Sequence, residues 1–340
     1  MNKSRCRSAR GLIWAGVLLL LGTFTLPVLP YLWASASNDI ASLDTVQNNP
    51  RANFWRNVRT GTAGYSAVGG PEANVLINND GQNWRQFRMR LLAPYGSYLM
   101  GAVLFTIAIF YALRGPVQHL SNEPKELLLR FSVYQRVVHW FTAILFWILA
   151  LTGLILLYGR FVLIPLFGSS GFALTASASK EAHNLFGPIF IVALFLLVIE
   201  YARDNFYRKG DLSWLIKGGG MLGKHASAGR FNFGEKIWFW LVLLLGTIIS
   251  FSGIILDFAN LNFDRNTLEL AHVLHGIAAI LFISVSFGHI YLGTIGTKGT
   301  LRGMTTGYVE QAWAELHHDK WRPDDGATPE ASRVPGAPNE

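Results

Sequence analysis

Residues 271–293 read AHVLHGIAAILFISVSFGHIYLG and combine an uninterrupted apolar character with histidines. This stretch carries no Asp, Glu, Lys or Arg, and it exceeds the roughly 20 apolar residues that a membrane-spanning helix needs. It nevertheless holds three histidines: His272, His275 and His289. An ionisable side chain in the hydrocarbon region is costly and by default marks a functional site. The stretch therefore predicts a transmembrane helix whose histidines serve a function.

The composition of the whole chain agrees with a membrane protein. Of its 340 residues, 51% are hydrophobic and 15% are charged, whereas soluble domains are about a quarter charged. The single cysteine, Cys6, excludes a disulfide framework, a cysteine-ligated iron–sulfur cluster and covalent haem attachment. The net charge of +8 is typical of basic cytoplasmic loops, and we expect no nucleic-acid partner.

Hydropathy predicts four further spans, at residues 92–113, 135–158, 182–201 and 236–258. Lys and Arg are concentrated in 114–136 and 202–236 and are sparse in 159–181 and 259–270. Basic loops face the cytoplasm, so the helix at 92–113 enters from outside and the C-terminus is cytoplasmic. We expect a multi-pass protein of the bacterial inner membrane, embedded in the lipid bilayer.

The start of the chain has the pattern of an export signal. A basic run precedes an apolar stretch that ends in Ala34-Ser35-Ala36, which predicts a signal peptide or an uncleaved anchor at 1–36. We then expect a periplasmic segment at 37–91, an extra transmembrane helix at 92–113, a four-helix domain at 131–308 and a cytoplasmic tail at 309–340.

The spacing of the histidines assigns them to two layers. His275 and His289 are 14 residues apart, which places them within about 40° of the same helix face and about 21 Å apart along the axis. The predicted topology brings His183 to the outer layer with His275, and His139 to the inner layer with His289. His272 lies off this face.

Two stacked His pairs in a four-helix bundle are what two b-type haems require, because each iron takes two axial imidazoles. We therefore predict an all-α integral membrane protein with a dihaem cytochrome b bundle, with Gly187, Gly276 and Gly288 giving the porphyrins room. Zinc prefers three or four ligands at one depth. A His proton relay usually includes acidic groups within the membrane, and the span interiors have none.

With these positions fixed, the chain resembles the gamma subunit of respiratory formate dehydrogenase, a membrane cytochrome b. The resemblance covers residues 131–308. It rests on Arg136-Val-Val-His139-Trp140, His183-Asn-Leu-Phe-Gly187-Pro188, Gly229-Arg-Phe-Asn-Phe-Gly-Glu-Lys236, and His275 followed by His289. The His spacing also fits the cytochrome b subunits of hydrogenases and related dehydrogenases, and the Gly229–Lys236 loop is the more specific part.

The resemblance implies an electron-transfer subunit with two haem b groups. Electrons would arrive from a periplasmic iron–sulfur beta subunit, pass the outer haem (His183, His275) and then the inner haem (His139, His289), and reduce a quinone. Formate oxidation would belong to a catalytic alpha subunit. The rival functions are the cytochrome b of a nickel–iron hydrogenase or another dehydrogenase and, from a different class, a His-lined ion transporter.

The resemblance places the quinone at Asn232 and Gly234. Asn232 equally fits a helix N-cap, because Glu235 three residues later completes a capping-box pattern. Arg136, Lys180 and Arg230 are candidate partners of haem propionates or simply interfacial charges. The other four histidines are expected to be solvated in loops: His119, His225, His317 and His318. Residues 308–321 are expected to form a short surface helix.

Overall fold

The computed structural model describes residues 56–64, 75–77, 79–116, 126–220 and 225–322. The predicted signal or anchor at 1–36, parts of the predicted periplasmic segment 37–91, His119 and the end of the predicted tail, 323–340, lie outside these residues. Within them, four helical segments are long and apolar enough to cross a membrane: Gly81–Arg114, Val133–Asn205, Phe233–Asp257 and Arg265–Gly296. The prediction of a largely helical, multi-pass membrane protein is confirmed.

The first of these segments starts earlier than the sequence predicts. After β1 (Thr62–Ala63), which pairs antiparallel with β2 (Val75–Ile77), helix α3 (Asp80–Phe87) runs through a π-helical stretch, η1 (Arg88–Leu92), into α4 (Ala93–Arg114). The predicted boundary between 91 and 92 thus falls inside a helix. Residues 83–90 of α3 and η1 read NWRQFRMR. Their polar side chains lower the mean hydropathy, so a hydropathy criterion does not detect this part of the helix.

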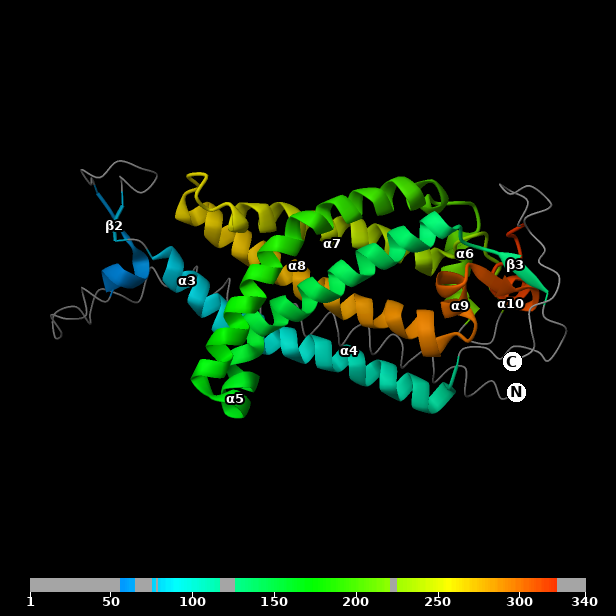
Figure 1. The fold of residues 1–340 in the computed structure, drawn as a ribbon, viewed down its shortest axis with the longest axis horizontal. Helices are drawn as coiled ribbons and strands as arrows, with labels where there is room; N and C mark the ends of the chain where they lie inside the picture. The colour runs from blue at the N-terminus through cyan, green and yellow to red at the C-terminus, as the bar shows by residue number, and fades with distance from the viewer. Residues whose placement is uncertain (1–55, 65–74, 78, 117–125, 221–224, 323–340) are drawn as a thin grey trace.

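Helix α5 (Val133–Tyr201) is one helical run that folds back on itself at Gly168, whose φ of 70° and ψ of 178° are accessible essentially only to glycine. Its two arms lie antiparallel (Figure 1), and the hydroxyl of Tyr201 donates to the carbonyl of Gln135 at 2.8 Å. The stretch 159–181, which the sequence places between two predicted spans, is helical on both sides of Gly168.

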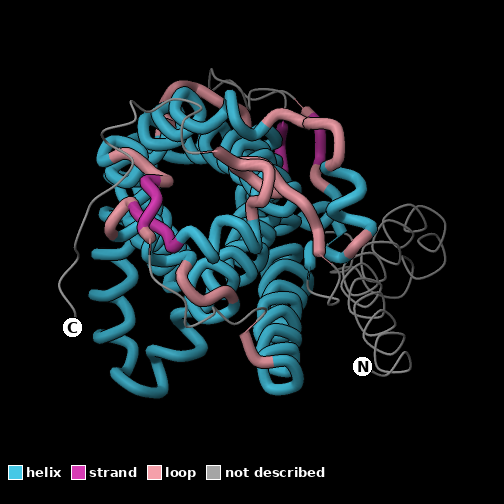
Figure 2. The backbone as a smooth tube through the Cα atoms, turned by 90° about the vertical axis from the view of Figure 1, so that its right-hand side faces the viewer, coloured by secondary structure: helices cyan, strands magenta, loops and turns pink. Residues whose placement is uncertain are grey.

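The other two long helices are α7 (Phe233–Asp257) and α8 (Arg265–Tyr291), and α8 continues into a second π-helical stretch, η4 (Leu292–Gly296). Polar side chains fix where both helices begin: Asn232 caps α7 and Asp264 caps α8. Viewed along the long axis, the helices lie around a common centre (Figure 2). Helix α4 runs beside α8 on the outside of this bundle (Figure 1).

The remaining short elements gather at one end of the bundle, here called the α10 end, opposite to β2 and α3 (Figure 1). They are β3 (Leu127–Leu129), η2 (Ala202–Asn205), α6 (Asp211–Ile216), η3 (Gly218–Gly220), α9 (Thr300–Thr305), β4 (Tyr308–Glu310) and α10 (Gln311–His317). Strands β3 and β4 pair antiparallel, with Leu128 opposite Val309. This ladder ties the residues that follow α9 to the start of α5.

The residues after β4 are packed against the bundle, whereas the sequence predicts a surface helix there. Trp313 of α10 lies over the guanidinium of Arg130 at 4.6 Å. His318 is 1% exposed and its Nδ1 lies 2.8 Å from the carbonyl of Gly229. The prediction of a solvated His318 is wrong, because the segment after β4 packs against the loop that precedes α7 and buries His318 there. His225 is exposed and pairs with Asp319 at 3.0 Å.

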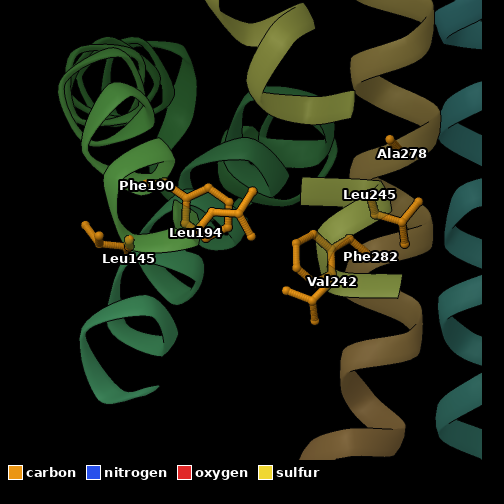
Figure 3. Close-up of a cluster of buried hydrophobic side chains, with 8 residues drawn as sticks. Leu145, Phe190, Leu194, Val242, Leu245, Ala278 and Phe282 are labelled. Carbon is orange, nitrogen blue, oxygen red and sulfur yellow. The ribbon is translucent and has the colours of Figure 1, made fainter. Parts of the chain in front are cut away.

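An apolar cluster fills the middle of the bundle (Figure 3). Both arms of α5, α7 and α8 contribute to it, through Leu145, Phe190, Ala193, Leu194, Val242, Leu245, Ala278 and Phe282. Phe282 lies halfway along α8 between His275 and His289. The cluster therefore separates two levels of the bundle, one at each histidine.

Candidate functional site

The structure brings the imidazoles of His183 and His275 close together, with their ring planes 72° apart. His183 comes from the second arm of α5 and His275 from α8, and their ring centroids are 6.1 Å apart. A metal–imidazole bond is about 2 Å long, so two imidazoles on opposite sides of one metal ion have centroids about 6 Å apart. The pair thus has the spacing of two axial ligands.

Hydrogen bonds orient both of these imidazoles through Nδ1. His183 Nδ1 lies 2.8 Å from the hydroxyl of Thr152. His275 Nδ1 lies 3.1 Å from the carbonyl of Ile249 and 3.2 Å from the hydroxyl of Ser252. A carbonyl can only accept, so Nδ1 of His275 carries the proton and its Nε2 keeps a lone pair for a metal ion.

The two hydroxyls face the histidines as acceptors. Thr152 donates to the carbonyl of Ile148 at 2.7 Å, and Ser252 donates to that of Ile248 at 2.7 Å. Because each hydroxyl proton is committed to the helix, each oxygen accepts from an imidazole Nδ1–H. His183 therefore has the same tautomer as His275, and both rings are prepared to bind a metal ion through Nε2.

Two glycines make space for these rings. A Cβ on Gly153 would lie 3.3 Å from Cε1 of His183, and one on Gly253 would lie 3.3 Å from Cε1 of His275. Gly187 borders open space, whereas Gly276 packs against Leu92, whose Cδ2 would lie 2.6 Å from a Cβ at Gly276. Both Gly187 and Gly276 line the cavity beside this histidine pair, and at Gly276 the helix leading into α4 also packs against the backbone. Their role in admitting a porphyrin stays a prediction.

A cavity of about 480 Å³ surrounds the His183–His275 pair. Most of its lining is aliphatic or aromatic, and Ser250 contributes a buried hydroxyl that has no hydrogen-bond partner in the described part of the chain. The volume is in the range typical of cofactor sites. An apolar cavity with two opposed imidazoles suits a flat, largely apolar metal macrocycle.

The second pair consists of His139, from the first arm of α5, and His289, from α8. Their ring centroids are 6.3 Å apart. The indole of Trp238 stacks on His289 with centroids 4.5 Å apart and planes 11° apart. Nδ1 of His139 is buried with no hydrogen-bond partner among the described residues. This pair is held by packing, whereas the His183–His275 pair is held by hydrogen bonds.

The donor set fits two bis-imidazole haems better than zinc. No group of three or more His, Cys, Asp or Glu side chains converges in the part of the chain that the structure describes, and protein zinc sites generally use three or four such ligands. Two opposed imidazoles at each of two levels match the axial ligation of two haem irons. His272 stays outside both pairs and stacks on Trp84 of α3, with centroids 4.8 Å apart.

The loop before α7 is a tightly bonded helix start. Asn232 Oδ1 accepts from the backbone of Glu235 at 3.0 Å, and Glu235 Oε2 accepts from the backbone of Asn232 at 2.7 Å. The interpretation of Asn232 as a helix cap is therefore confirmed, and no described residue accepts a hydrogen bond from its Nδ2. Gly234 lies against the indole of Trp214: a Cβ at Gly234 would be 3.0 Å from Cη2 of Trp214.

Two arginines lock this loop to the start of α5. Arg130 donates to the carbonyl of Arg230 at 3.2 Å, and Arg230 donates to the carbonyl of Arg130 at 3.1 Å. Arg230 also pairs with Asp204 at 2.7 Å. Arg136 donates to the carbonyl of Thr305 at 2.7 Å. Of the three predicted propionate candidates, Lys180 is the one that lines the His183–His275 cavity.

Three residues that orient the ligands escape prediction from the sequence: Thr152, Ser252 and Trp238. A signal for the first two is present, since TGLIL at 152–156 and SGIIL at 252–256 form an internal repeat. In each copy a hydroxyl residue precedes a glycine that lies against an imidazole. Trp238 has no such signal, because an aromatic residue in a span is usually packing.

More than half of this chain is similar to known proteins. The family model described as prokaryotic cytochrome b561 matches residues 130–307. The cytochrome b556(fdo) subunit of formate dehydrogenase from Escherichia coli (strain K12) is 28% identical over 202 residues, which cover 58% of this chain and 92% of that protein. The cytochrome b556(Fdn) subunit of the nitrate-inducible enzyme from the same strain is 26% identical over 203 residues, covering 58% and 90%.

The formate dehydrogenase cytochrome b556 subunit of Haemophilus influenzae (strain ATCC 51907 / DSM 11121 / KW20 / Rd) is 27% identical over 213 residues, covering 59% of this chain and 84% of that protein. The predicted resemblance to the membrane cytochrome b of formate dehydrogenases is confirmed. The family model matches just over half of the chain, and the matched residues 130–307 include His139, His183, His275 and His289. The chain belongs to the prokaryotic cytochrome b561 family.

Proposed function

We propose that this protein is the dihaem cytochrome b subunit of a formate dehydrogenase and delivers electrons to a membrane quinone. The proposal rests on one observation: one bundle holds two pairs of imidazoles at two levels. The ring centroids within each pair are 6.1 Å and 6.3 Å apart. His183 and His275 would hold one haem b, and His139 and His289 the other. Bound haem supplies one-electron transfer, which protein side chains do not provide.

The chain's own residues set the conditions for that transfer. Thr152, Ser252 and the Ile249 carbonyl fix the tautomers of one ligand pair, which raises the basicity of the imidazoles. The apolar cluster around Phe282 keeps water out of the space between the two levels. Phe146 and Phe282, with ring centroids 4.9 Å apart, lie in this layer.

We assign the α10 end to the cytoplasm because the basic loops lie there. The iron–sulfur subunit and the formate-oxidising subunit would then meet the opposite, periplasmic end. In this orientation the protein moves electrons inward past His183–His275 and then past His139–His289. Labelling of single cysteines tests the orientation, because the chain has one native cysteine. Labelling of a residue in 202–220 from the periplasm would reverse it.

The quinone would bind at the loop before α7, near the His139–His289 level. Asn232 uses Oδ1 to cap the helix, so its Nδ2 is the group that would donate a hydrogen bond to a quinone carbonyl. Trp214, packed over Gly234, would form a wall of that site. Proton delivery to a reduced quinone is feasible at this end because the loop is close to water.

The experiment that tests the function uses membranes containing the whole complex. Formate should produce a b-type reduced-minus-oxidised spectrum, and a quinone analogue should reoxidise the haems. The same membranes are given hydrogen instead of formate as the matched control. Reduction by hydrogen and not by formate would assign the subunit to a hydrogenase, and absence of a b-type spectrum would favour a transporter without cofactor.

A further inference from the structure

The segment that precedes the family-matching region forms part of the His183–His275 cavity. Trp84 of α3 and Arg88 and Leu92 of η1 line it together with the two histidines. Leu92 fills the face left open by Gly276, and Gly96 of α4 lies against Ile280 in the same close manner. The hydroxyl of Tyr158 donates to the carbonyl of Ala93 at 2.9 Å. The segment is therefore a wall of the cavity.

Arg88 is the charged residue that this wall brings to the cavity. Its side chain is half-buried, and Nη2 donates to the carbonyl of Leu156 at 2.5 Å. None of the ion pairs among the described residues involves Arg88. A guanidinium has five N–H donors in a fork that matches a carboxylate, so most of its donors remain available.

The other charged residues that line the cavity indicate the charge of the ligand that would bind there. Lys180 adds a second cation, and Asp257 is the one carboxylate among the lining residues that the structure describes. His272 lines the same region and is held flat against Trp84. The lining therefore carries an excess of positive charge around a mostly apolar space. The chemical class that fits is an apolar ring system bearing carboxylates.

We propose that Arg88 binds a propionate of the haem held by His183 and His275. The inference rests on the proposed function, because it needs a haem at that pair. It makes the segment 80–114, which lies outside the region matched by the family model, a component of the cofactor site. The π-helical turn at Arg88–Leu92 is the local feature that places Arg88 and Leu92 on the cavity, in keeping with the frequent use of π-bulges at functional sites.

A cation beside a haem stabilises the reduced form, since reduction removes one positive charge from the iron. Arg88→Gln should therefore lower the midpoint potential of one haem in a spectroelectrochemical titration of the purified protein. We expect about a tenfold change in the reduction equilibrium, or about 59 mV for one electron. Arg88→Lys should restore most of the wild-type potential. Arg90→Gln, two residues further and exposed, should leave both potentials unchanged.

Reconstitution of the haem-free protein with haem or haem dimethyl ester gives a second readout, which also serves if Arg88→Gln holds haem poorly. In the wild type the ester should bind more weakly than haem at one site, and Arg88→Gln should remove that difference. If both potentials stay at wild-type values, or if Arg88→Gln leaves the preference for free propionates intact, the inference is wrong. If the wild type binds no haem at all, the proposed function itself fails.

Discussion

Thr152 and Ser252 make the same two contacts on opposite sides of the bundle: each donates to the carbonyl four residues earlier and meets Nδ1 of a facing histidine. Each is followed by a glycine that lies against the imidazole. The two residues belong to repeated sequences, TGLIL and SGIIL. Helices α5 and α7 thus each provide a hydroxyl and a glycine in the same arrangement, one set for His183 and one for His275.

This relationship predicts that the two hydroxyls stabilise metal binding at the His183–His275 pair. Thr152→Val and Ser252→Ala should each weaken haem binding there by about 10-fold or more, the usual effect of removing a partner that orients a ligand. Haem affinity and the electron paramagnetic resonance signal of the ferric haem measure the effect. Thr106→Val is the matched control, because Thr106 also bonds its own helix but is exposed on α4. Equal losses in all three variants would rule out a specific role.

The quinone proposal predicts a defect that leaves the haems intact. Asn232→Asp keeps an oxygen to cap α7 but removes the Nδ2 donor. Formate should still reduce both haems, and quinone should reoxidise them more slowly, by about 10-fold if one hydrogen bond of about 1.4 kcal/mol is lost. Stopped-flow absorbance at the b-type band measures the rate. Unchanged reoxidation in Asn232→Asp would place the quinone elsewhere.

The packing of α10 predicts a response to pH. Burial, together with the nearby Arg130, lowers the pKa of His318 well below its ordinary value of 6.5 and that of His317 to about 4. Because the undocked segment binds protons more readily, docking is fully stable above pH 6.5 and weakens as the pH falls toward 4. Between pH 7.5 and 5.5 the His318 contribution alone should increase opening about tenfold.

Hydrogen exchange of the amides in residues 311–318, corrected for the intrinsic pH dependence, measures this opening. His318→Asn combined with His317→Gln retains a side-chain donor toward the Gly229 carbonyl and removes both titrations. The double variant should exchange at nearly the same rate at the two pH values. Exchange in the wild type that does not change between pH 7.5 and 5.5 would contradict the interpretation.

The sequence predicted the parts of the molecule that depend on helical periodicity. His275 and His289 share a face because 14 residues are close to a whole number of turns, and topology then supplies His183 and His139. It also indicated the extra helix now seen as α4. These features depend on the position of each residue along its own helix.

Features that depend on contacts between distant segments were not predictable in this way. The fold-back of α5 at Gly168 needs one φ value in an otherwise helical segment. His318 is buried only because β4 pairs with β3 and positions α10 over Arg130. Gly276 packs against Leu92 because η1 reaches the cavity that both residues line. His318 and Gly276 are therefore contacted by residues that lie far from them in the sequence.

If the four paired histidines hold two haems, the number of haem b groups per polypeptide must be two. A pyridine haemochrome assay on the purified wild-type protein should give two haems, and His275→Ala should give one. His272→Ala should keep two, since His272 stacks on Trp84 and faces no second histidine at ligand spacing among the described residues. A wild-type count of zero or one, or loss of a haem in His272→Ala but not in His275→Ala, would contradict the account.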